Sequence, residues 1–130
     1  MGKINNMIKT IKEIHKEDIV MIKIGNFYHA YGKDACLLSY IFDYKLKEEN
    51  DTYTTGFPIN GINKIIANLE SMKINYILLD KRNNYEVDQK SDNKSINNYM
   101  KYYEKARKQA KYKIKIEKIY DYMQKNISKN

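Results

Sequence analysis

The side chains of this sequence that could do chemistry are mostly cations, and they gather toward the C-terminus. From residue 93 onward there are eleven Lys or Arg against three Asp or Glu, whereas the first 92 residues contain 13 of each kind. The formal net charge of +8 therefore lies in the last part of the chain. Lysine and arginine at this density can neutralise nucleic-acid phosphates, and neighbouring tyrosines such as Tyr102 or Tyr112 can stack on bases. The candidate phosphate contacts are Lys101, Lys105, Arg107, Lys108 and Lys111.

Two plainer explanations of this charge stay open. Lys, Asn, Ile and Tyr dominate the sequence and are all favoured by AT-rich codons, so a biased genome would give a basic, tyrosine-rich protein without any nucleic-acid partner. Codon bias does not easily place the whole excess at one end of the chain. A long helix with charged side chains around it is also explained as a solvated surface helix.

Groups typical of catalysis or metal binding are sparse. Two histidines, His15 and His29, and the single Cys36 do not supply the four ligands of a structural zinc site. Cys36 lies in an apolar stretch, where we expect a small core residue instead of a reactive thiol. The sequence contains no Gly-x-x-x-x-Gly-Lys-Ser/Thr loop and no recognisable Ser-His or Cys-His frame. We therefore expect no ATP hydrolysis, no other enzymatic activity and no cofactor.

The spacing of the hydrophobic residues predicts a mixed α/β fold, with a mixed sheet flanked by helices and followed by a basic C-terminal helix. Apolar residues three and four positions apart indicate helices, and β-branched or aromatic runs bounded by glycine indicate strands. Asp34 and Asn60 are predicted to cap the helices that follow them. The predicted helices cover residues 4–14, 34–42, 60–72 and 96–110, and the predicted strands cover 19–24, 27–31, 44–47, a piece around 53, 75–79 and 85–87.

A wholly polar segment, residues 88–95, predicts a linker between a compact domain at 1–90 and a basic helical extension at 91–130. We expect the domain to stay folded when the linker is cut. Residues 111–116 alternate like a strand but also fit a helix, and the helical flanks favour a continuous or once-broken helix. No apolar run is long enough to span a bilayer and no signal-peptide layout is present, so a cytoplasmic protein without membrane contact is expected.

Four pieces of sequence occur in a fixed order between Asp18 and Asp80. They are Met-Ile-Lys-Ile-Gly-Asn-Phe-Tyr-His at 21–29, Gly-Lys-Asp-Ala at 32–35, Thr-Gly-Phe-Pro at 55–58, and a helix that leads to Tyr-Ile-Leu-Leu at 76–79. In this order and spacing the segment resembles the N-terminal mismatch-recognition domain (domain I) of the MutS DNA-repair family. The resemblance covers half to two-thirds of the chain and leaves out the basic tail. The connector, lever, clamp and ATPase domains of a full repair protein have no counterpart in this sequence.

The resemblance implies recognition of DNA without catalysis. In the family, the phenylalanine of a Phe-x-Glu motif enters the minor groove and stacks on an unpaired or mispaired base, at a step that is already weak. Carried over to this chain, Phe27 is the wedge and Tyr28 supports it from the core. Ile24, Asn26 and the turn Gly56-Phe57-Pro58 are expected to lie nearby. Ordinary strand packing of Phe27 is the competing explanation.

The chain departs from the family beside the wedge. His29 stands where the family has a glutamate that accepts a hydrogen bond from the mispaired base. A neutral imidazole can accept or donate, and a charged imidazole only donates. Asn26 also replaces the usual aspartate. We therefore expect only a weak preference for mispaired over perfect duplex, with His29 either a DNA contact or an ordinary residue of the strand face.

Two functions are compatible with these residues. The first is a non-catalytic module that binds mismatched, bulged or otherwise distorted DNA, or an RNA/DNA hybrid, and holds phosphates with its tail. Similar stand-alone domains occur beside reverse transcriptases in diversity-generating retroelements, so a reverse transcriptase or another repair protein is the expected protein partner. The second is an interaction adaptor that kept the fold and lost mismatch recognition. Its tail would pair with another protein, or form a homodimer through the stripe Tyr99, Tyr103, Ala106 and Ala110.

Overall fold

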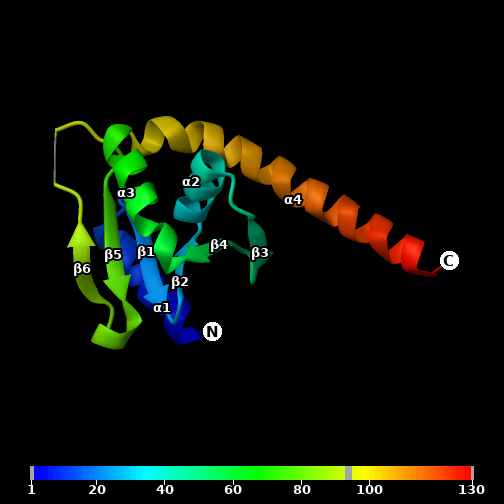
Figure 1. Ribbon diagram of the computed structural model, residues 1–130, viewed down its shortest axis with the longest axis horizontal. Coiled ribbons are helices and arrows are strands. Elements are labelled where there is room, and N and C mark those ends of the chain that lie inside the picture. Colours follow the sequence, from blue (N-terminus) through cyan, green and yellow to red (C-terminus); the bar gives the residue numbers. More distant parts are fainter. Residues whose placement is uncertain (1, 93–94, 130) are drawn as a thin grey trace.

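The computed structural model describes residues 2–92 and 95–129, and a six-stranded sheet lies at its centre (Figure 1). The strand order is β3-β4-β2-β1-β5-β6. The β1–β5 pair is parallel and the other pairs are antiparallel, so the predicted mixed α/β fold is confirmed. The strands are β1 (Ile19–Ile24), β2 (Phe27–Tyr31), β3 (Lys47–Glu49), β4 (Thr52–Pro58), β5 (Tyr76–Asp80) and β6 (Glu86–Lys90).

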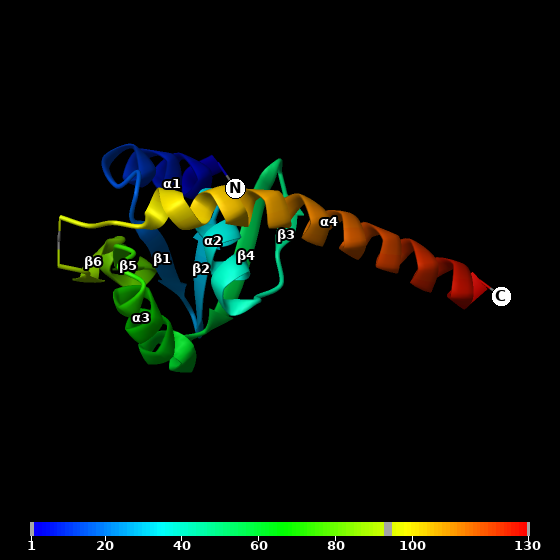
Figure 2. The ribbon, with the colours of Figure 1, turned by 90° about the horizontal axis from the view of Figure 1, so that it is seen from above.

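Helices cover the two faces of this sheet unequally. The helices are α1 (Gly2–Ile14), α2 (Lys33–Phe42), α3 (Ile62–Ser71) and α4 (Tyr99–Lys129), with short 3-10 turns η1 (Ile59–Gly61) and η2 (Lys81–Asn83). The main core lies on one face, where α2, α3 and the first half of α4 pack. On the other face α1 packs against β1 and β5, where Val20, Ile22, Ile77 and Leu79 form a second apolar cluster (Figure 2). None of the helices in the described ranges is long and apolar enough to cross a membrane.

Most of the predicted elements are confirmed, because their hydrophobic spacing is regular. The helix predicted from residue 60 begins at Ile62, and Asn60 lies in η1 instead of capping it. The strands predicted at 44–47 and around 53 lie further along the chain, as β3 and β4. Residues 111–116 are helical, as favoured, within one continuous α4.

Three further local predictions are wrong. Gly56-Phe57-Pro58 is not a turn but the last part of β4, paired with the start of β2. The predicted linker at 88–95 begins too early, because Asp88 to Lys90 belong to β6; two of its residues, 93–94, lie outside the described ranges. Asp34 does not cap α2, since the residue at that cap is Gly32, which has no side chain that could form a capping hydrogen bond.

The carboxylate of Asp34 instead points into the core, where it joins four elements. It accepts hydrogen bonds from the backbone N–H of Val20 (3.1 Å), from Lys12 Nζ (3.1 Å) and from the hydroxyl of Tyr99 (2.5 Å). Burial raises the pKa of this carboxyl to about 6, and the neighbouring Lys12 opposes the rise. Because Tyr99 is the first residue of α4, the basic helix is anchored to the sheet through this carboxylate.

The first half of α4 is therefore part of the core. Tyr99, Ala106, Ala110 and Ile114 are buried against α2, so most of the stripe expected to hold a homodimer is occupied by the protein itself. Lys113 adds a further tie, because its Nζ lies 3.0 Å from Asp43 Oδ1. The division of the chain at residues 90 and 91 stays a prediction, but its first part would lose these contacts if it stood alone. The second half of α4 extends away from the sheet (Figure 1).

Candidate nucleic-acid interface

The residues expected to read DNA lie at the tight turn between β1 and β2. Two residues, Gly25 and Asn26, connect the paired Ile24 and Phe27. Gly25 has a φ of 63°, which glycine adopts without steric cost. The carbonyl of Asn26 accepts a hydrogen bond of 3.0 Å from the backbone N–H of Ile59, which ties the turn to the start of η1. The turn thus presents Phe27 from a fixed backbone.

Strand alternation separates the side chains of β2 into two sets. Tyr28 and Ala30 are buried in the main core. The ring of Tyr28 stacks on that of Phe57 at 5.6 Å between centroids, and Phe57 stacks in turn on Tyr44 at 5.3 Å. Tyr28 and Phe57 are therefore buried, and their rings pack against the core face of the strand that carries Phe27.

On the face of the sheet opposite the main core, four of the predicted residues come together. Phe27 is 46% exposed and pairs with Pro58, while His29 pairs with Gly56. The rings of Phe27 and His29 are 6.4 Å apart between centroids. A Cβ at position 56 would lie only 3.3 Å from His29 Nδ1, so glycine there lets the imidazole lie close to β4. Phe27 is therefore an exposed residue on a packed support, not a core residue.

The imidazole of His29 is neutral at neutral pH. Partial burial lowers its pKa below the ordinary value of 6.5, because the charged form is less well solvated there. A neutral imidazole keeps one acceptor nitrogen and one donor nitrogen. His29 can therefore still accept a hydrogen bond from a base, although without the negative charge of a carboxylate. Asn26 is exposed at the turn, and Ile24 is half-buried on the same side of the sheet.

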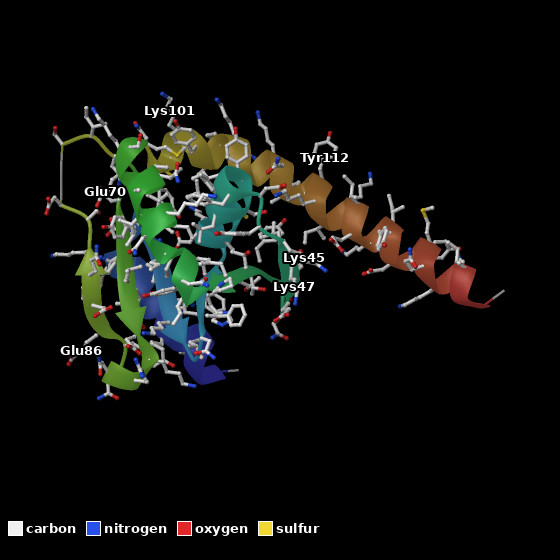
Figure 3. All side chains as sticks on the ribbon, in the orientation of Figure 1. Lys45, Lys47, Glu70, Glu86, Lys101 and Tyr112 are labelled. Carbon is white, nitrogen blue, oxygen red and sulfur yellow. The ribbon has the colours of Figure 1, made fainter. Side chains whose placement is uncertain are left out.

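An open hollow of about 490 Å³ continues this surface toward β3. Besides Phe27 and His29 it is lined by Tyr31, Lys45 and Lys47, which the sequence reasoning did not select. Alternation could have found Tyr31, because it follows Phe27 and His29 at two-residue steps. The two lysines come from the segment around β3 (Figure 3), and only the pairing of β3 with β4 brings them here. The hollow thus joins an aromatic surface to two lysines and to one carboxylate, that of Glu49.

Comparison with known proteins decides the family. The MutS domain I family matches residues 4–96 of the chain. The chain belongs to the MutS domain I family. This is a non-catalytic DNA-binding domain, which in MutS serves mismatch recognition. The match includes the whole sheet and the hairpin that carries Phe27, and it ends before α4.

Full-length relatives are much longer than this chain. The DNA mismatch repair protein MutS of Thermotoga petrophila is 30% identical over 59 residues, which are 45% of this chain and 7% of the relative. MutS of Petrotoga mobilis is 31% identical over 72 residues, which are 53% of this chain and 9% of the relative. The chain thus corresponds to less than a tenth of the length of these relatives.

The tail cations lie outside the part that matches MutS domain I. Lys101, Lys105, Arg107, Lys108 and Lys111 are all exposed on α4. Lys101 points away from the sheet (Figure 3), and Lys105 and Lys108 follow it at steps of four and three residues, so the three share one side of the helix. Arg107 Nη2 lies 3.1 Å from Glu104 Oε2. The hairpin turn lies at the opposite end of the sheet from α4, so the structure does not bring these cations to Phe27 (Figure 1).

Proposed function

We propose that this member of the MutS domain I family is a non-catalytic module that binds distorted duplex, with Phe27 inserted at a mispaired or bulged step. The duplex is DNA, or an RNA/DNA hybrid. The observation that carries the proposal is an exposed Phe27 on a strand whose next residue, Tyr28, is locked in a stack of aromatic rings. A wedge needs both properties, because the ring must be free to stack while its backbone resists displacement.

The surroundings of Phe27 supply the other parts of such a site. Lys47 lines the same hollow and is placed to hold a phosphate that flanks the opened step, and Lys45 lies beside it with its Nζ 3.8 Å from Glu117 Oε2. Pro58 and Gly56 are uncharged residues of the neighbouring strand β4, and Pro58 lies directly opposite Phe27. The neutral His29 accepts one hydrogen bond from a base but without charge, so the preference for mispaired duplex is modest.

The lysines of α4 form a second phosphate surface in this proposal, not an extension of the first. Lys101, Lys105 and Lys108 face solvent on the side of the helix opposite the core. There they can contact the phosphates of a duplex, which need not compete with carboxylates of the sheet for these lysines. This surface gives affinity without sequence or mismatch preference. We assign the module to DNA repair or reverse transcription, as an accessory of a repair protein or a polymerase.

The proposal is tested by fluorescence anisotropy titrations against perfect, mismatched and bulged DNA duplexes, single-stranded DNA and an RNA/DNA hybrid, at several salt concentrations. The wild-type protein is expected to bind the bulged and mismatched duplexes several-fold more tightly than the perfect duplex. Phe27→Ala should remove this difference, a loss of about 1–3 kcal/mol on distorted duplex. Because Phe27 is exposed, the variant should keep its circular dichroism spectrum and its unfolding midpoint.

Val87→Ala is the matched control, since Val87 is a similarly exposed apolar residue on the edge strand β6. It should leave every affinity unchanged. If folded Phe27→Ala binds each duplex as the wild type does, Phe27 is not a wedge. Equal binding of all duplexes by the wild type would favour the alternative, an adaptor that kept the fold and lost mismatch recognition.

A further inference from the structure

The second half of α4 carries large apolar side chains that nothing in the described protein covers well. Seven of them are between 52% and 68% exposed, although the same helix buries its apolar residues nearer its start. At about 100° per residue, all of these except Tyr122 fall within an arc of about 100° on one side of the helix. The residues within the arc are Tyr112, Ile116, Ile119, Tyr120, Met123 and Ile127, which we call the distal stripe.

The distal stripe has a symmetric spacing. It reads the same in both directions about the midpoint between Ile119 and Tyr120. Tyr112 then corresponds to Ile127, and Ile116 corresponds to Met123. An antiparallel copy of the same helix would therefore place an apolar side chain opposite each member of the stripe. Such self-complementarity is what a two-fold interface requires.

We propose that two copies of this chain associate through the distal stripe as an antiparallel helix pair, with the two-fold axis between Ile119 and Tyr120. Steps of four and three residues between Tyr112, Ile116, Ile119 and Met123 are those of a coiled-coil seam. The seam spans about 23 Å along the helix. Its interface of roughly 1,000 Å² lies toward the small end of specific interfaces, so association in the micromolar range is expected.

The charges beside the stripe favour the antiparallel arrangement. A parallel pair would bring the lysine-rich first halves of the two helices together, so that Lys101, Lys105 and Lys108 of both copies repel one another. The antiparallel pair moves these halves apart.

The acids of this half point elsewhere and leave the seam apolar. Glu117 Oε2 lies 3.8 Å from Lys45 Nζ, and the next residue of the helix faces β3, where Lys118 Nζ lies 3.7 Å from Glu48 Oε1. Glu117 and Lys118 thus meet the body of each copy on a side of α4 outside most of the distal stripe, whereas Ile116 of the stripe also lines an open hollow beside Asp43 and Tyr44. The dimer would carry two Phe27 hairpins far from its axis.

Sedimentation velocity of the full chain at about 10–100 µM tests the association. The wild type should be a dimer in this range, and the double substitution Ile119→Glu with Met123→Glu should make it a monomer with unchanged circular dichroism. Lys125→Glu is the control, because it changes the net charge by the same amount on the other side of the helix. A wild-type monomer throughout this range overturns the proposal, as does a dimer that survives the double substitution.

Cysteine cross-linking tests the direction. With Ile116→Cys and Met123→Cys as separate proteins, an antiparallel pair should form a disulfide only when the two are mixed and oxidised. A parallel pair would cross-link each variant with itself and would refute the arrangement. Native Cys36 is buried, so the wild type should not cross-link and serves as the background control. Neither result depends on DNA, so it stands apart from the test of Phe27.

Discussion

Replacing Tyr99 by Phe removes one buried hydroxyl and leaves the ring in place, so it measures how firmly α4 is anchored. The hydroxyl donates to Asp34 Oδ1 at 2.5 Å, and both side chains are almost completely buried. Asp34 keeps Lys12 and the N–H of Val20 as partners. A hydrogen bond to a charged group contributes about 1.5–3 kcal/mol to the free energy of unfolding. We expect Tyr99→Phe to lower the free energy of unfolding by this amount at pH 8.

The loss should depend on pH through Asp34. Its folded pKa of about 6 lies above the ordinary 3.8, so the folded state binds this proton more readily than the unfolded state. The stabilisation from that proton is fully present below about pH 4 and is lost as the pH rises through about 6. The hydroxyl of Tyr99 holds the pKa down, so without it the folded pKa rises further. The penalty of Tyr99→Phe should therefore grow as the pH rises through 6, by roughly 1 kcal/mol between pH 5 and pH 8.

Urea unfolding followed by circular dichroism at pH 5 and pH 8 measures both quantities. Tyr103→Phe is the matched control, because Tyr103 lies one turn further along α4, stacks on Tyr99 and is only half-buried. It should change the free energy of unfolding by less than about 0.5 kcal/mol. A penalty for Tyr99→Phe that is absent at both pH values, or larger at pH 5, would refute the anchoring role of the Tyr99–Asp34 bond.

Three further substitutions test the candidate interface. Gly56→Ala should displace the His29 ring, since the new Cβ would lie 3.3 Å from Nδ1. It should lower the free energy of unfolding by about 1 kcal/mol and lower the preference for bulged over perfect duplex, as measured by urea unfolding and anisotropy. Gly61→Ala is the control, because its Cβ would have its nearest neighbour at 4.0 Å, and it should change neither the stability nor the preference. Replacing Lys101, Lys105 and Lys108 by Gln should reduce the slope of log K against log salt by roughly 2–3 and leave the preference between duplexes intact. The control replaces three other exposed lysines, Lys64, Lys73 and Lys81, by Gln and should not affect the slope. His29→Glu should raise the preference for mispaired duplex and weaken total binding, because it adds a charged acceptor near phosphates; equal weakening on every duplex in anisotropy titrations would contradict a base contact by this residue.

The parts of the fold that the sequence predicts well are those with a strict local period. The alternation of β2 already separates Tyr28 from Phe27 and His29, and the structure places these residues on opposite sides of the sheet. Gly56 and Pro58 are residues typical of turns, so the sequence wrongly predicts a turn at this segment. Both are tolerated in β4 because Gly56 makes room for His29 and Pro58 lies at the end of the strand, where the ladder stops.

Contacts between distant segments were not predictable from local pattern. Asp34 and Tyr99 are 65 residues apart, and an aspartate near a helix start is ordinarily read as a cap. The stripe that includes Ala106 and Ala110 was correctly placed on one side of a helix, but spacing does not tell what covers that side. The structure shows that α2 does, and that the exposed apolar residues of the distal stripe begin at Tyr112 on another side of the helix.

Photo-cross-linking reports most directly whether the ring of Phe27 contacts a base at a distorted step. A duplex with a single bulged 5-iodouracil is bound to the wild-type protein and irradiated, and mass spectrometry identifies the attached residue. We expect attachment at Phe27, with His29 as the second site, and no attachment at this hairpin when the same base is paired in a perfect duplex. Attachment confined to tyrosines of α4, or equal attachment from bulged and perfect duplex, would contradict it.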